Sequence, residues 1–341
     1  MKTIKTLMAA VVSMLACIGS NAANLNIPTV LIDSAGNSGD FERPSEDPGR
    51  TDGYGAVAYE YYIGTTEVTN AQYVTFLNAV AKSDPNGLYN IKMESTGLLG
   101  DSGCGIIRSG TDGNYVYTVV AGRENYAVNY VSLFDAARFC NWVTTGDTEI
   151  GVYTIVGSDD LGKIIRNAEA WEAGGVALPT VDEWHKAAYY NPADDSYYKY
   201  PTSSDSISLS DANYLDFEAM MQGALDVTDA GYGTSSPYGT FGQGGNVWEW
   251  NETVVYSSVA DIFDRQFYGR LGGSFWTFED DLSSSGDNNY GLTIDEDNVT
   301  GFRVVSLAPI LIPEPGTYAT IFGLLALGFA AYRKRAIAPK K

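Results

Sequence analysis

Residues 245–250 read Gly245-Asn246-Val247-Trp248-Glu249-Trp250, a turn followed by two indoles on either side of one carboxylate. Indoles in such a motif usually pack in a core beneath loops, so Trp248 and Trp250 are predicted to be buried. Taken by itself, Glu249 is predicted to be an ordinary surface acid. The stretch therefore predicts an aromatic core segment that carries one acid.

Three helices are predicted upstream of this stretch, because each begins with a capping box. In this pattern a Ser or Thr is followed three residues later by Gln, Asp or Glu, and the two side chains bond backbone amides of the first turn. The predicted helices cover residues 69–81, 132–143 and 180–190.

The rest of the chain is predicted to be short strands and loops. Strands are expected at residues 26–33 and 56–63. Residues 200–245 hold no long periodic segment, and residues 279–300 are predicted to form a polar surface loop. The pattern indicates an α+β fold with few helices, short strands and much irregular structure.

Composition excludes several classes of function. The 341 residues include 42 Asp or Glu and 21 Lys or Arg, a net charge of −21, whereas a nucleic-acid binder needs a basic face. One histidine, His185, cannot build a site that needs two or three imidazoles. Three cysteines cannot form a disulfide-dense scaffold or a four-cysteine zinc site. Cys104 and Cys140 are able to pair in an oxidising compartment, although the helical pattern around Cys140 predicts a small core residue.

Five further segments accompany residues 245–250 in order along the chain. They are 63–70 (IGTTEVTN), 128–132 (VNYVS), 178–184 (LPTVDEW), 272–276 (GGSFW) and 301–303 (GFR). Together the six segments resemble the formylglycine-generating enzyme (sulfatase-modifying factor) domain. The resemblance implies one domain at residues 23–307 with a C-type-lectin-like fold, little regular secondary structure and bound calcium.

The same resemblance argues against the family's oxidase chemistry in this chain. Active members bind copper through two cysteines after the Gly-Gly-Ser motif, and those positions correspond to Thr277 and Leu282 here. Soft thiolates suit Cu(I), and neither residue supplies one. We therefore expect no catalytic residues of this type and no copper. A related branch uses iron held by several histidines, which a single histidine forbids.

The resemblance implies two calcium sites. In the first, Asn213 and Asp229 supply side-chain oxygens, and Tyr214 and Gly231 supply carbonyls. Calcium takes six to eight such oxygen ligands.

The second implied site uses the Glu249 carboxylate with the carbonyls of Gly245 and Val247. Gly242 stands where the family has an Asp or Asn, so this site is expected to be weaker or completed by water. The alternative for Asp229 and Glu249 is that both are ordinary surface acids.

Four residues near the family's active cleft are candidates for ligand contact, namely Ser274, Trp276, Thr277 and Arg303. Trp276 follows the Gly-Gly-Ser turn, next to the family's active cleft, so a core position and contact with a ligand are both open to it. Nothing in the sequence places a general base beside Ser274, so nucleophilic catalysis is unsupported.

Both ends of the chain carry export signals. Residues 1–22 have two lysines, an apolar run and small residues before the expected cleavage point, which is typical of a signal peptide rather than a buried helix. After a linker at 308–312, residues 313–335 contain Pro313-Glu314-Pro315, an apolar helix and Arg333-Lys334-Arg335. This order resembles the PEP-CTERM sorting tail of Gram-negative bacteria, which an exosortase recognises and cuts. Residues 336–341 would remain as a basic cytoplasmic tail. A plain membrane anchor is the alternative.

Three functions follow as hypotheses. The first is a non-catalytic module of the cell surface or exopolysaccharide matrix of a Gram-negative bacterium, which binds a glycan or surface partner. The second is a structural matrix protein braced by cations. The third is an enzyme of altered chemistry in the same fold. The sequence favours the first, because it lacks the reacting cysteines and carries sorting signals.

Overall fold

The computed structural model describes residues 25–42, 50–97, 102–215, 223–227, 233–255, 265–286 and 289–310. The predicted signal peptide and sorting tail, including Pro313–Pro315 and Arg333–Arg335, lie outside these residues. Within the described ranges, no helix has the length and apolar character needed to cross a membrane.

The three capped helices form as predicted. They are α2 (Asn70–Val80), α3 (Leu133–Thr145) and α5 (Val181–Tyr189), and each has both hydrogen bonds of its capping box. Gly146 ends α3 with a φ of 86°, a left-handed conformation that glycine adopts without steric cost. A five-residue helix, α4 (Ala168–Glu172), and two 3₁₀ turns, η1 (Ile91–Glu94) and η2 (Glu279–Leu282), complete the described helical elements.

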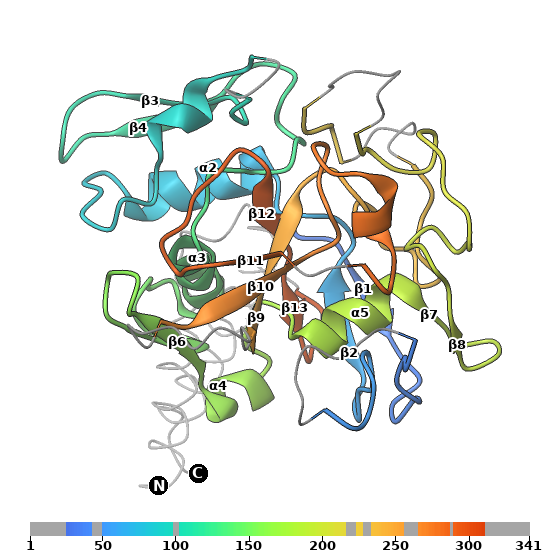
Figure 1. Ribbon diagram of the computed structural model, residues 1–341. Coiled ribbons are helices and arrows are strands. Elements are labelled where there is room, and N and C mark those ends of the chain that lie inside the picture. Colours follow the sequence, from blue (N-terminus) through green and yellow to red (C-terminus); the bar gives the residue numbers. More distant parts are fainter. Residues whose placement is uncertain are drawn as a thin grey trace, which may run out of the picture.

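Among the described residues, two sheets of three or more strands hold the fold together. The larger has the strand order β11 (Asn289–Gly291), β10 (Phe267–Leu271), β9 (Trp248–Val255) and β12 (Thr300–Phe302). The β12–β9 pair is parallel and the other two pairs are antiparallel. Figure 1 shows this sheet at the centre, with α3 on one side and α5 on the other.

The second sheet brings the two ends of the domain together. Its order is β1 (Thr29–Ile32), β2 (Tyr61–Gly64) and β13 (Val305–Ser306), all antiparallel. The two predicted strands at 26–33 and 56–63 therefore exist, shorter than expected and displaced toward their C-terminal ends. Three two-stranded ribbons lie outside the sheets: β3 (Ile106–Ser109) with β4 (Val116–Val119), β5 (Tyr153–Val156) with β6 (Lys163–Arg166), and β7 (Tyr190–Asn191) with β8 (Ser196–Tyr197).

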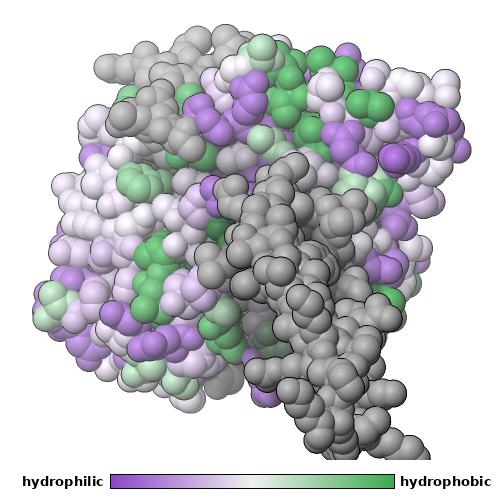
Figure 2. All heavy atoms as spheres, turned by 180° about the vertical axis from the view of Figure 1, so that it is seen from behind, coloured by the Kyte–Doolittle hydropathy of each residue, from purple (hydrophilic) through white to green (hydrophobic). Residues whose placement is uncertain are grey.

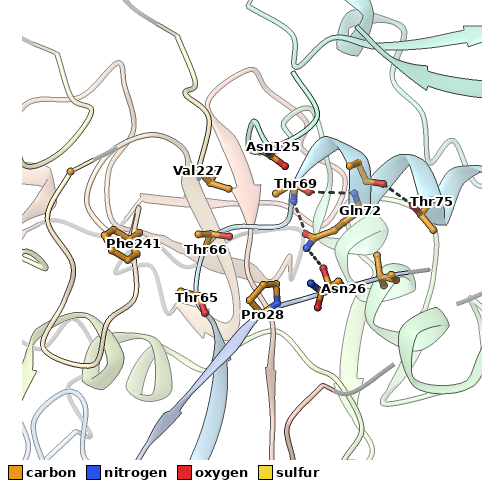
Figure 3. A pocket seen from close by; sticks show the side chains of 13 residues that line it. Asn26, Pro28, Thr65, Thr66, Thr69, Gln72, Thr75, Asn125, Val227 and Phe241 are labelled. Atoms are coloured by element: carbon orange, nitrogen blue, oxygen red, sulfur yellow. Dashed lines mark hydrogen bonds between the residues drawn. The ribbon is translucent and has the colours of Figure 1, made fainter. Parts of the chain in front are cut away.

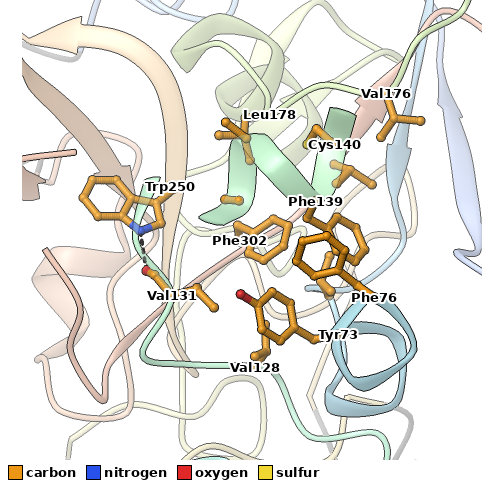
Figure 4. Packing of buried hydrophobic residues seen from close by; sticks show 14 of the residues in the cluster. Tyr73, Phe76, Val128, Val131, Phe139, Cys140, Val176, Leu178, Trp250 and Phe302 are labelled. Atoms are coloured by element: carbon orange, nitrogen blue, oxygen red, sulfur yellow. Dashed lines mark hydrogen bonds between the residues drawn. The ribbon is translucent and has the colours of Figure 1, made fainter. Parts of the chain in front are cut away.

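The main core joins α2, α3 and β12 through aromatic rings (Figure 4). Phe139 of α3 packs edge-on against Phe302 at 5.3 Å between ring centroids, and against Phe76 of α2 at 5.4 Å. Tyr73 is fully buried, and its hydroxyl donates to the carbonyl of Leu88. Edge-on contacts of this kind add to the free energy of area burial, so these rings fix how the helices meet the sheet.

Residues 279–300 are not simply the predicted surface loop. They contain η2 and β11, and Leu282 and Thr293 are completely buried. The segment reads as polar, yet pairing of β11 with β10 makes it an edge of the central sheet. On the face seen from behind relative to Figure 1, the exposed apolar residues form small patches that polar residues separate (Figure 2).

Candidate functional site

Trp248 and Trp250 begin β9 and are buried, which confirms the prediction from the sequence. The indole nitrogen of Trp250 donates to the carbonyl of Val131 at 2.9 Å. The guanidinium of Arg270 lies 4.1 Å from the Trp250 ring centroid. Both indoles therefore belong to the frame of the site rather than to its surface.

Glu249, between them, is completely buried and paired with Arg303. Arg303 Nε donates to one Glu249 oxygen at 2.5 Å, and Nη2 donates to the other at 2.6 Å. The Trp184 indole also donates to this carboxylate, at 2.7 Å. Arg303 donates further to the carbonyls of Gly64 and Phe241. A planar guanidinium held by a bidentate carboxylate is the strongest form of such a pair.

A second buried carboxylate, Glu67, lies beside the same guanidinium. Its Oε2 is 3.8 Å from Arg303 Nη2, and its Oε1 accepts from Asn246 Nδ2 at 2.8 Å. Burial raises the pKa of Glu67 to about 7, because the Arg303 charge lowers the pKa less than burial and the neighbouring Glu249 raise it. Two carboxylates thus share one cation inside the domain.

Glu249, the one side-chain ligand of the second implied calcium site, has other partners and is not the surface acid that the sequence alone predicted. Both Glu249 oxygens already accept from Arg303, so a bound cation would lie against a guanidinium; this geometry does not favour calcium there. Gly245 has a φ of 79°, and Val247 is buried in an apolar cluster.

The first implied calcium site is described only in part. Asn213 pairs with Gly245 in an isolated bridge, and its side-chain amide donates to the carbonyl of Gly223 at 2.9 Å. Tyr214 packs on a small cluster that contains Leu282, while Asp229 and Gly231 lie outside the described residues. Calcium on this set stays a prediction. In the described part of the chain, no cluster of three or more His, Cys, Asp or Glu side chains is placed to hold a metal ion.

The four cleft candidates separate into two buried and two accessible residues. Ser274 and Arg303 are completely buried, whereas the Trp276 side chain is 44% exposed and Thr277 is half-buried. The Thr277 hydroxyl donates to the Ser274 carbonyl and accepts from the Ser274 amide, which closes the turn. Ser274 Oγ accepts from the Trp276 amide at 3.2 Å. The hydroxyls of Ser274 and Thr277 therefore form hydrogen bonds within the turn, and the Trp276 indole is exposed to solvent.

At the other position that the resemblance assigns to a copper ligand, Leu282 packs under the glycines of the site. A Cβ added to Gly273 would lie 2.6 Å from a Leu282 methyl, and one added to Gly244 would lie 3.5 Å from the other. Cys104 and Cys140 are buried and free, and burial raises the pKa of both thiols. His185 is a buried packing residue whose Nε2 lies 3.0 Å from Asp40.

A pocket of about 670 Å³ opens elsewhere, beside the start of α2. It lies among β2, α2 and the loop that contains Phe241, and Figure 3 shows threonine and amide side chains along it with Phe241 at one end. Its lining comes from segments more than 200 residues apart, so no local pattern predicted it. The threonines of the 63–70 segment are a signal of the pocket in the sequence, and they also belong to a family motif.

Residues 34–308 match the Sulfatase-modifying factor enzyme 1-like domain. No curated protein matches the chain. Among solved structures, one titled "Crystal Structure of CarF" superimposes with a TM-score of 0.57 at 20% identity, covering 83% of this chain and 99% of that one. Treponema denticola variable protein 1 superimposes with a TM-score of 0.51 at 17% identity, covering 83% and 95%. These likenesses show a shared fold, and the domain match shows that the chain belongs to the sulfatase-modifying factor enzyme 1-like family.

Proposed function

We propose that this protein is exported to the cell surface or extracellular matrix and that its domain binds a glycan without catalysing a reaction. The signal-peptide pattern at residues 1–22 and the sorting-tail pattern at 313–335 support export, processing by an exosortase-type enzyme and transient anchoring in the inner membrane. The net charge of −21 supports a partner that is not an anionic polymer, unless cations bridge the two.

The observation that carries the proposal is the Gly-Gly-Ser turn. The two positions that the resemblance assigns to copper hold a leucine that is completely buried and a threonine whose hydroxyl closes the turn. Neither offers a thiolate or a free nucleophile. Next to them Trp276 exposes an indole, and an indole face packs well against the C–H face of a sugar ring.

Calcium has a supporting place in the proposal. The oxygen-rich set of Asn213, Tyr214, Asp229 and Gly231 would hold the ion and brace the loops around the turn. Retention of a glycan would then depend on calcium through loop order. We do not place calcium at Glu249.

The test is a pull-down with exopolysaccharide from the producing cells. Residues 23–311 are incubated with it in calcium or in chelator, after circular dichroism has shown that the protein is folded. We expect retention in calcium, and about tenfold weaker binding for Trp276→Ala. Tyr290→Ala is the matched control, because the Tyr290 side chain is 46% exposed on β11, away from the turn in sequence.

The outcomes separate the alternatives. A folded protein that is not retained in either condition contradicts glycan binding and leaves a structural matrix role. Conversion of a matrix substrate that is lost in Ser274→Ala would instead support an enzyme of altered chemistry.

A further inference from the structure

The pocket beside α2, called here the threonine pocket, is lined by thirteen residues of the described chain. None of these thirteen carries a charge, although 18% of the chain's residues are charged. An anionic ligand would find no cation in this lining, and a metal ion or ammonium group would find no carboxylate. The lining therefore favours a neutral ligand.

The start of α2 does not add an anion site to the pocket. Helix N-termini attract anions when their first amides are unpaired. Here the amides of Asn70 and Ala71 donate to the carbonyls of Tyr126 and Glu124, and the Gln72 amide donates to Thr69 Oγ1. The first-turn donors are already occupied by the protein.

The hydroxyls of the pocket offer both kinds of hydrogen bond. Thr66 and Thr75 donate to the backbone carbonyls of Glu67 and Ala71, so their oxygens keep lone pairs that accept. Thr69 Oγ1 accepts from the Gln72 amide and keeps its hydrogen to donate. A ligand whose groups both donate and accept fits this set.

Two polar side chains of the pocket remain available to a ligand. In the part of the chain that the structure describes, neither the Thr65 hydroxyl nor the Asn26 side-chain amide has a hydrogen-bond partner. Gln72 Nε2 donates to the backbone carbonyl of Asn26 at 2.6 Å, which holds that residue at the rim and leaves its side chain unbonded.

One end of the pocket is apolar, beside Thr65 and Thr66. Phe241 and Val227 belong to one apolar cluster, and both line the pocket (Figure 3). The volume of about 670 Å³ lies within the range of small-molecule sites, which combine apolar walls with a few placed polar groups. A sugar has hydroxyls on its edge and C–H bonds on its faces. Its hydroxyls can bond the threonine and amide side chains while its C–H face packs on Phe241 and Val227.

We propose that the threonine pocket binds a neutral sugar unit, as a short oligosaccharide or the end of a longer glycan. This rests on the proposed glycan-binding function and adds a site separate from the exposed Trp276. The ligand class is neutral and polyhydroxylated, so uronate-bearing, phosphorylated or sulfated units are excluded from this pocket.

The experiment uses the full chain in mild detergent and two pools of labelled oligosaccharides. Exopolysaccharide from the producing cells is partly hydrolysed and separated by anion exchange into a neutral and an anionic pool, and binding is followed by fluorescence anisotropy. We expect the neutral pool to bind. Thr65→Val should weaken that binding about fivefold, since it removes one hydrogen bond at nearly constant volume.

The variants keep the test decisive. Thr65→Ser restores the hydroxyl and should bind like the unmodified chain. Thr118→Val, at an exposed threonine of β4, should change nothing, and Asn26→Ala at the exposed rim should weaken binding about as much as Thr65→Val.

Three results would overturn the inference. One is a folded chain that binds no neutral oligosaccharide, and another is equal binding of the neutral pool by Thr65→Val and the unmodified chain. The third is Thr65-dependent binding of the anionic pool alone. If whole exopolysaccharide is still retained through Trp276 in these cases, the proposed function stands and only the pocket assignment fails.

Discussion

Replacement of Glu67 by glutamine should remove a large part of the pH dependence of stability. The carboxyl is completely buried beside Arg303 and Glu249, and its pKa is raised from about 4.5 to about 7. The folded state therefore binds this proton more tightly than the unfolded state. Stability from this group is fully present below pH 4.5 and is lost as pH rises through 7.

The magnitude follows from the displacement of the pKa. A difference of about 2.5 units corresponds to about 3 kcal/mol in the free energy of unfolding between pH 4.5 and 7. Glutamine keeps an oxygen that accepts from Asn246 and has no proton to exchange. Any pH-independent cost of the amide moves the whole profile and leaves its slope unchanged.

The assay is urea unfolding at a series of pH values from 4.5 to 8, followed by tryptophan fluorescence. We expect the fall in the free energy of unfolding across this window to be about 3 kcal/mol smaller in Glu67→Gln than in the unmodified protein. Buried Asp135 and half-buried Glu296, whose pKa values are also raised by desolvation, contribute equally to both profiles. Glu60→Gln, at an exposed site just before β2, is the control. Parallel profiles for Glu67→Gln and the unmodified protein would refute the reasoning.

Three further changes test the frame of the site by the same unfolding assay. Arg303→Met should cost about 3–5 kcal/mol at pH 7.5, because it leaves the buried Glu249 carboxylate without its cation; a loss below 1 kcal/mol would contradict that pairing. Gly245→Ala should cost more than about 2 kcal/mol, since its φ is 79° and the new Cβ would lie 2.1 Å from the carbonyl oxygen of Asn213; an unchanged midpoint would show that the turn is built differently. Thr180→Ala should cost about 1 kcal/mol through loss of the α5 cap, and Thr180→Ser should recover most of it.

The helices were predictable because their signals are local. Thr69, Ser132 and Thr180 each lie three residues before the side chain that completes the capping box, and the structure has both bonds in all three. The burial of Trp248 and Trp250 was predictable for a related reason, since two large apolar rings in one short motif have few alternatives to the core. Family membership followed from six motifs in order, and the domain match confirms it.

The family, the three capped helices and the aromatic core segment could therefore be predicted from the residues alone. The pairing of Glu249 could not be predicted in this way, because its partner Arg303 is 54 residues away and the contact depends on β12 lying parallel to β9. The same holds for the threonine pocket, whose walls come from distant segments brought together by two sheets. Helix caps and turns depend on interactions between residues a few positions apart, so neighbouring residues are enough to predict them. Charge pairing and cavities depend on contacts between remote residues, which exist only after the chain has packed.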